Sequence, residues 1–172
     1  MNVTNNGRRP PTVGYLAVLE DPQLGFAGGL LVISASGRPL EFHCSTPLAV
    51  TRAQEILFGT TLRSHLCGEL IATTLLKTAK ITPTVLLVQD PAAAPPAAGV
   101  PTMLLAPPTD DAQPAPRLIA GGDSDAAVAE IDALLDALVN HVELAEPFER
   151  VQEAVREAQR LSVQEAPASD AA

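Results

Sequence analysis

The stretch Gly25 to Pro47, GFAGGLLVISASGRPLEFHCSTP, decides the fold class, because two apolar runs flank a Ser-Ala-Ser-Gly break. Leu30 to Ile33 form a continuous β-rich run, which is typical of a strand covered on both faces. Gly37 supplies the positive φ that a short hairpin loop usually needs. We therefore expect a β-hairpin at the centre of a sheet, followed by the start of a helix.

Length and composition indicate one domain with an aliphatic core. The chain has 172 residues, of which 47% are hydrophobic, but it holds only one tyrosine, four phenylalanines and no tryptophan. Such a length is enough to bury a sizeable core. The scarcity of aromatic side chains argues against stacking platforms for single-stranded nucleic acid.

The net charge of −9 is unevenly distributed along the chain. Residues 1–89 hold seven Lys and Arg against five Asp and Glu, whereas residues 90–172 hold four against fifteen. An acidic half repels phosphate backbones and cannot gain affinity from counterion release. We therefore do not expect nucleic acid as a partner.

Cysteine usage and hydropathy favour a cytoplasmic protein without a membrane partner. Cys44 and Cys67 are the only cysteines, and neither belongs to a CxxC pair or to a dense secreted-type framework. The first residues lack the apolar segment of a signal peptide, and the longest apolar run, at 28–33, is far shorter than a membrane span.

Turn and cap signals divide the chain into one folded domain with two tails. We expect a disordered leader over 1–11, a single domain over 12–163 and a disordered tail over 164–172. Pro/Ala-rich loops at 90–100 and 107–116 interrupt the domain.

Hydrophobic periodicity predicts the order of the elements. Thr51 and Gln54 have the spacing of a capping box for a helix over 51–58. Ser124 or Asp125 can cap a later helix, and Pro147 suits the first turn of the last one. The other expected elements are strands at 12–19, 84–89, 101–106 and 117–120, and a helix at 61–80. These elements predict an α+β fold: a single mixed β-sheet with an N-terminal antiparallel meander, one helical crossover and two C-terminal helices.

Cys44 is the sharpest candidate for nucleophilic chemistry. It follows a strand and precedes an expected helix, where backbone amides and the helix dipole can lower a thiol pKa. His65 is the best candidate base, with Glu69 four residues on to orient its ring. The commoner interpretation is that Cys44 and Cys67 are small buried hydrophobes and that His65 and Glu69 form an exposed pair.

Asp90 is a candidate ligand-binding residue, because it follows the strand TVLLVQ at the end where α/β folds often bind ligands. A turn-initiating aspartate is the commoner explanation. Glu41 and His43 share one strand face and can project into a groove or into solvent. The pairs His43-Cys44 and His65-x-Cys67 diverge too far to hold one metal ion, so we expect no metal and no cofactor.

The strand, the Ser-x-Ser-Gly turn at 34–37 and the following strand resemble the central hairpin of roadblock, longin and profilin-like modules. That resemblance implies a dimerising or docking scaffold. The resemblance covers about twenty residues. Hairpins of this kind occur in many unrelated sheets. The helix that precedes this hairpin in roadblock domains is missing here.

Two functions of different class remain open from the sequence. The first is a non-catalytic protein-interaction or regulatory module, which binds a protein partner or forms a homo-oligomer through the acidic face of the last helix, at Glu149, Glu153 and Glu157. The second is a small-molecule enzyme or ligand-binding domain that uses the strand-end residues Cys44 and Asp90 together with His65. A polar pocket that joins these last three residues would favour the second function.

Overall fold

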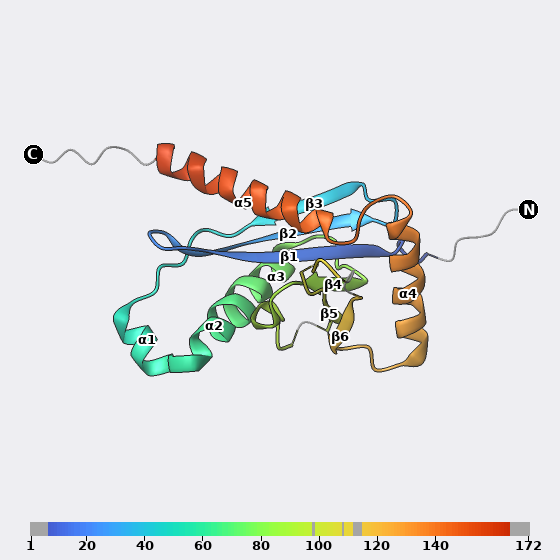
Figure 1. Cartoon of the computed structure of the whole chain (residues 1–172), viewed down its shortest axis with the longest axis horizontal. Helices are drawn as coiled ribbons and strands as arrows, with labels where there is room; N and C mark the ends of the chain where they lie inside the picture. Colours follow the sequence, from blue (N-terminus) through green and yellow to red (C-terminus); the bar gives the residue numbers. More distant parts are fainter. Residues whose placement is uncertain (1–6, 98, 108, 112–114, 166–172) are drawn as a thin grey trace, which may run out of the picture.

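A computed structural model describes residues 7–165 of the chain, except 98, 108 and 112–114. The sheet in this part of the chain has six strands in the order β3-β2-β1-β4-β5-β6 (Figure 1). Its strands are β1 (Thr12–Asp21), β2 (Gly25–Ser34), β3 (Pro39–Cys44), β4 (Val85–Val88), β5 (Thr102–Leu104) and β6 (Arg117–Ala120).

The strand directions confirm the predicted α+β fold. β1, β2 and β3 form an antiparallel meander, and β4 pairs with β1 in parallel. β5 is parallel to β4, while β6 closes that side antiparallel to β5. A helical crossover leads from β3 to β4, and two helices follow β6. The helical segments are α1 (Arg52–Phe58), η1 (Gly59–Thr61), α2 (Leu62–Ser64), η2 (His65–Ala72), α3 (Thr73–Thr78), η3 (Pro91–Ala93), α4 (Asp125–Val139) and α5 (Glu146–Glu165).

The β2–β3 hairpin lies at one side of the sheet, so the expectation of a central hairpin was wrong. β3 is the outermost strand, and the central pair is β1 with β4. The crossover carries the chain past β2 and places β4 on the far side of β1. The alternation of apolar and polar residues in LEFHC is the local signal for a half-exposed edge strand.

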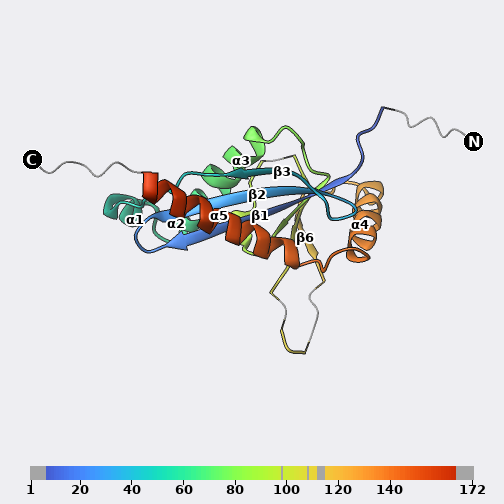
Figure 2. The same cartoon turned by 90° about the horizontal axis from the view of Figure 1, so that it is seen from above.

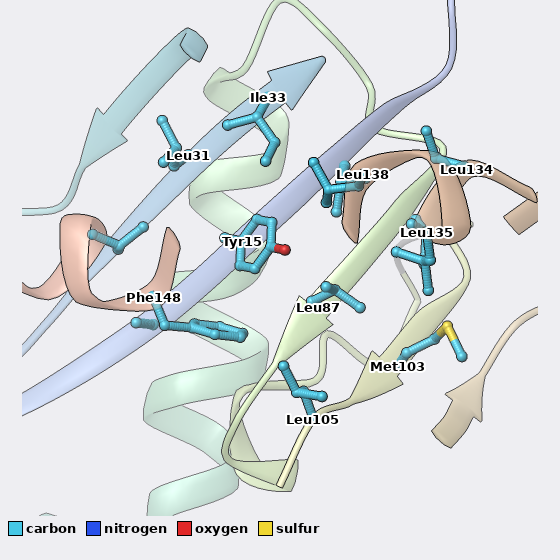
Figure 3. Close-up of a cluster of buried hydrophobic side chains, with 14 of the residues drawn as sticks. Tyr15, Leu31, Ile33, Leu87, Met103, Leu105, Leu134, Leu135, Leu138 and Phe148 are labelled. Atoms are coloured by element: carbon cyan, nitrogen blue, oxygen red, sulfur yellow. The ribbon is translucent and has the colours of Figure 1, made fainter. Parts of the chain in front are cut away.

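Both faces of the sheet are covered by helices, which explains the continuous apolar runs in β1 and β2. Figures 1 and 2 show α5 on one face and the α2–α3 segment on the other. Tyr15 and Leu16 are both fully buried and belong to the cores on these two faces. Figure 3 shows the first core, in which Tyr15 packs edge-on against Phe148 from α5 with 4.9 Å between ring centroids.

Gly28 and Gly29 in β2 allow both helical layers to approach the sheet closely. A Cβ atom on Gly28 would lie 2.4 Å from Cγ2 of Ile71, on the η2 side. A Cβ atom on Gly29 would lie 2.6 Å from Cγ2 of Val155 and 2.8 Å from Cγ1 of Val151, on the α5 side. These two glycines are therefore packing residues inside a strand.

The predicted helix over 61–80 is present, but its middle is a π-helix, η2. The wider turn changes the buried stripe, so that Cys67 is buried while Leu70 is partly exposed. Gly68 lets η2 approach the segment around η3 closely, because a Cβ there would lie 2.7 Å from the backbone oxygen of Ala94. The sequence pattern predicts the helix but assumes a uniform helical repeat.

The remaining predicted elements agree closely with the structure. Thr51 and Gln54 form the expected capping box at α1, and Ser124 caps α4. Phe148 and Val151 are buried in α5, as its apolar stripe predicts. Most of the predicted disordered leader and tail, at 1–6 and 166–172, lies outside the described residues, but residues 164–165, which the sequence pattern places in the tail, form the end of the last helix.

No helix in the described part of the chain combines the length and the apolar character that crossing a membrane requires.

Candidate functional site

Cys44 lies at the end of β3 and packs against the core on the α5 side of the sheet. It is half-buried and lines a hollow of about 170 Å³ together with Gln159 of α5. Burial raises the pKa of its thiol, the opposite of what activation requires. The helix predicted over 51–58 begins at Arg52, eight residues after Cys44, so the thiol does not lie at a helix N-terminus that could lower its pKa.

His65 and Glu69 form the exposed pair that their spacing predicts. Nδ1 of His65 lies 2.7 Å from Oε2 of Glu69, and the His65 ring stacks on Phe58 with 4.4 Å between centroids. Both residues belong to η2, which covers the sheet face opposite to α5. The structure therefore does not bring His65 together with Cys44.

Asp90 binds Arg63. Oδ2 of Asp90 accepts hydrogen bonds from Nε and Nη2 of Arg63 at 2.9 and 2.7 Å, and Oδ1 caps η3 by accepting the amide of Ala92 at 2.9 Å. Nη1 of Arg63 donates to Oε2 of Glu20 at 3.1 Å, and its guanidinium lies 5.8 Å from the ring centroid of Phe26. Asp90 thus has both a turn-initiating role and a structural ion pair.

Sequence reasoning missed this cluster because its members are far apart in the chain. Arg63 is 43 residues from Glu20 and 27 residues from Asp90. The local signal at Asp90 was correct, but only the fold brings the end of β1, the end of β4 and α2 to one place. The hydrogen bonds that Arg63 donates to Asp90 raise the already high pKa of Arg63, so the guanidinium stays charged.

Glu41 has a structural role that the sequence did not show. Its carboxylate accepts the backbone amides of Lys80 and Ile81 at 2.8 and 2.9 Å and contacts Nε2 of His43 at 2.5 Å. Burial alone would raise the pKa of Glu41, but these hydrogen bonds outweigh it and lower the pKa to about 2. The carboxylate thereby ties β3 to the segment between α3 and β4.

The acidic residues predicted on the last helix lie on its exposed face. Glu149, Glu153 and Glu157 follow one another at four-residue spacing along α5, and all three are exposed. Arg160 binds Glu157 and lowers its pKa. In the part of the chain that the structure describes, Glu149 and Glu153 form no ion pair.

Helix α1 is the most unusual feature of the surface, because none of its residues is buried. It extends away from the sheet in Figure 1. Leu57 is 81% exposed and Ile56 is 66% exposed, which makes them the two most exposed large apolar residues described. The capping box at Thr51 and Gln54 predicted α1, but no sequence pattern indicated that its apolar side chains would be exposed.

A hollow of about 300 Å³ lies between α1 and the β1–β2 turn. Its walls combine apolar side chains with carboxylates. The lining includes Phe26, Val50 and Leu62 on the apolar side and Glu20, Asp21 and Glu55 on the acidic side. Such a lining fits a basic side chain with an apolar stem.

A larger groove of about 690 Å³ lies beside the tip of the β2–β3 hairpin. Its lining is mainly apolar and includes Pro11, Leu40 and Ile81, while Arg9 and Lys80 are its two cationic residues. In the described part of the chain, Arg9 and Lys80 take part in no ion pair. The groove therefore suits an apolar molecule that carries an anionic group.

No group of three or more His, Cys, Asp or Glu that could hold a metal ion occurs among the described residues. No protein-family model matches the chain, and no curated protein shows significant similarity to it.

Proposed function

We propose that this chain is a non-catalytic protein-interaction module that binds a basic partner protein. The observation that carries the proposal is α1, which buries none of its own residues and holds Ile56 and Leu57 in solvent. Large apolar side chains gathered on an exposed element mark binding surfaces more often than ordinary surface. A cytoplasmic location belongs to this proposal, and the two unpaired cysteines support it.

The hollow beside α1 supports a partner of basic and apolar character. The carboxylates of Glu20, Asp21 and Glu55 line this hollow, and Glu55 belongs to α1 together with the exposed Leu57. A partner segment that carries a lysine or arginine beside an apolar residue would bury Leu57 and place its charge among these carboxylates. Arg63 and Arg52 neutralise part of this acidic surface, so apolar contact supplies most of the affinity.

The acidic face of α5 supports the same charge preference. Glu149 and Glu153 are exposed and have no described ion-pair partner, so they contribute to a negative field over this side of the molecule. Such a field speeds the encounter with a basic partner and is screened by salt. We therefore assign α5 to steering and α1 to the bound contact.

The proposal is tested with a partner that co-purifies with the tagged full chain and is then purified for binding measurements. Leu57→Lys should weaken the equilibrium affinity by about tenfold or more, because it replaces an apolar contact with a charge that repels a basic partner. The matched control is Val139→Lys on α4, which changes another exposed apolar residue and should leave the affinity unchanged.

The steering role is tested separately by association rates at low and high salt. The double variant Glu149→Lys, Glu153→Lys should slow association at low salt, and Asp132→Lys, Asp136→Lys on α4 is the matched charge control. The proposal would be contradicted if Leu57→Lys left the affinity for the partner unchanged and if neither salt nor charge reversal on α5 changed the association rate.

The groove beside the hairpin favours a second candidate function, the binding of an amphipathic anion. The residues Cys44, His65 and Asp90 do not support a ligand site, since Cys44 packs on the α5 face of the sheet while His65 and Asp90 each bind another side chain, Glu69 and Arg63. The groove has the volume of an ordinary ligand site and combines apolar walls with Arg9 and Lys80.

This second candidate is tested by calorimetric titration of the full chain with decanoate and, in parallel, with decylamine. Decanoate should bind the chain more tightly than decylamine does. Lys80→Glu should abolish the difference, whereas Lys77→Glu, on the same segment but outside the groove, should preserve it. Equal affinity for both amphiphiles would show that the groove has no anion preference.

A further inference from the structure

The two edges of the sheet differ in how well they are protected against pairing with another strand. β6 has four residues, begins with a charged arginine and has an irregular register with β5. β3 has six residues, and its side chains Leu40 and Phe42 are 43% and 38% exposed. Edge strands are usually blunted by charge, brevity or irregular pairing. β3 has an irregular pairing only at its first residues, and its one carboxylate, Glu41, binds the amides of Lys80 and Ile81 within the same chain.

Backbone hydrogen bonds fix which groups of β3 point outward. The Ser45 amide donates to the Gly28 oxygen at 2.9 Å, and Leu48 exchanges hydrogen bonds with Phe26 further along the same edge. Successive residues of an antiparallel strand point their amide and carbonyl groups alternately to opposite sides. The amide and carbonyl groups of Phe42 and Cys44 therefore point to the outer edge, where no described strand pairs with them.

The residues on either side of Phe42 are complementary to each other when two copies of β3 lie antiparallel. A two-fold axis through Phe42 places Glu41 of one copy opposite His43 of the other, and Leu40 opposite Cys44. Opposite or neutral neighbours across a strand pair favour that register, whereas like charges disfavour it. Glu41 is the only carboxylate between residues 34 and 50, so two chains of net charge −9 meet here with little repulsion.

We propose that two copies of this chain associate through β3, antiparallel about a two-fold axis near Phe42, so that their sheets join into one. The outward amides and carbonyls of Phe42 then pair with each other across the axis. Such an interface uses the same residues on both copies and closes on itself, which limits assembly to a dimer. It involves neither α1 nor the acidic face of α5, so it is independent of the basic partner proposed above.

The test measures the oligomeric state of the full chain by sedimentation over a dilution series. The parent chain should be a dimer that dissociates on dilution. Leu40→Lys and Phe42→Lys should each raise the dissociation constant by about tenfold or more, because a lysine on an edge strand opposes pairing. Leu57→Lys changes an exposed residue far from β3 and should leave the dimer intact.

Amide hydrogen exchange separates this interface from any other. In the dimer the amides of Phe42 and Cys44 should exchange slowly, and dilution or Leu40→Lys should make them fast. The amides of Glu41 and His43 point toward β2 and should remain protected in every case. A cooperative melting transition shows that each lysine variant is folded, and Leu40→Lys serves if Phe42→Lys is not folded.

A parent chain that stays monomeric throughout the series would overturn the proposal and leave the edge to a strand of a different protein. A dimer that persists in both lysine variants, or one in which the amides of Phe42 and Cys44 exchange fast, would overturn it as well. Assembly beyond a dimer through β3 has the same consequence, because a closed two-fold interface leaves no unpaired β3 edge.

Discussion

Single side chains connect distant parts of this fold through long-range hydrogen bonds. Glu41 binds two backbone amides beyond α3, and the hydroxyl of Tyr15 donates to the carbonyl oxygen of Leu144 at 2.8 Å. Both contacts are long-range, and the one at Tyr15 satisfies the hydroxyl of a fully buried side chain. Changing either residue should therefore lower the stability of the fold.

Glu41→Gln should reduce the free energy of unfolding at neutral pH by roughly 1–3 kcal/mol, because two amides lose a charged acceptor. The folded-state pKa of Glu41, about 2, lies below the usual value of 4.5, so the ionised carboxylate stabilises the fold above about pH 4.5. That contribution is lost as the pH falls from 4.5 toward 2. Denaturant unfolding at several pH values should show a shallower acid loss in Glu41→Gln than in the parent.

The control for this prediction is Glu149→Gln, which removes an exposed carboxylate from α5. It should leave both the neutral-pH stability and the acid slope close to those of the parent. If Glu41→Gln and the parent lose unfolding free energy equally as the pH falls, other carboxylates govern acid unfolding.

Tyr15→Phe should cost roughly 0.5–1.5 kcal/mol, because it removes one hydrogen bond and leaves the ring in place. Burial, with Glu146 nearby, raises the pKa of the Tyr15 phenol above its usual value of 10.0. The folded state therefore loses stability as the pH rises above about 10, and Tyr15→Phe should lack this alkaline loss. Since Tyr15 is the only tyrosine, ultraviolet absorbance reports its ionisation directly.

At the scale of elements, contact between the sheet and its helices depends on small residues in β2. Gly29 faces Val151 and Val155 of α5, while Gly28 faces Ile71 of η2. A strand with side chains at both positions would hold both layers further away. The helices on both faces can bury their apolar stripes against the sheet because β2 has glycine at these two positions.

Gly29→Ala should destabilise the fold by roughly 1–3 kcal/mol, because the new methyl group overlaps Val155. Shortening that neighbour should relieve the overlap, so Gly29→Ala combined with Val155→Ala should cost less than the sum of the two single changes. Chemical denaturation of all three variants measures this coupling. If the stability losses of the two single variants simply add in the double variant, α5 moves away from the new methyl group without cost.

At the scale of the whole molecule, two cores share the same strands. β1 contributes Tyr15 to the core under α4 and α5 and Leu16 to the core under η2 and α3. Neither face can lose its helices without exposing strands that the other face needs. We therefore expect the domain to unfold as one cooperative unit.

Leu66→Ala and Leu138→Ala remove fully buried side chains from the two cores, one on each face. Each should cost about 2–5 kcal/mol, and the double variant should show nearly the sum, since the sites share no contact across the sheet. Circular dichroism and calorimetry should report one transition in all variants. Separate transitions for the two faces would contradict a single cooperative unit.

Sequence patterns by themselves determined the type and order of the elements and the fold class. Apolar runs, caps and helical spacing are local properties, and the chain forms the elements that they predict, including the capping box at Thr51. Only tertiary structure decided the position of the β2–β3 hairpin at the edge, the π-helical turn at Gly68 and the partners of Glu41 and Asp90. Those features depend on contacts between residues far apart in the chain, and no local pattern contains them. The same limit applies to the surface: the capping box at Thr51 and Gln54 predicts a helix, but only packing shows that nothing in the described chain covers Ile56 and Leu57.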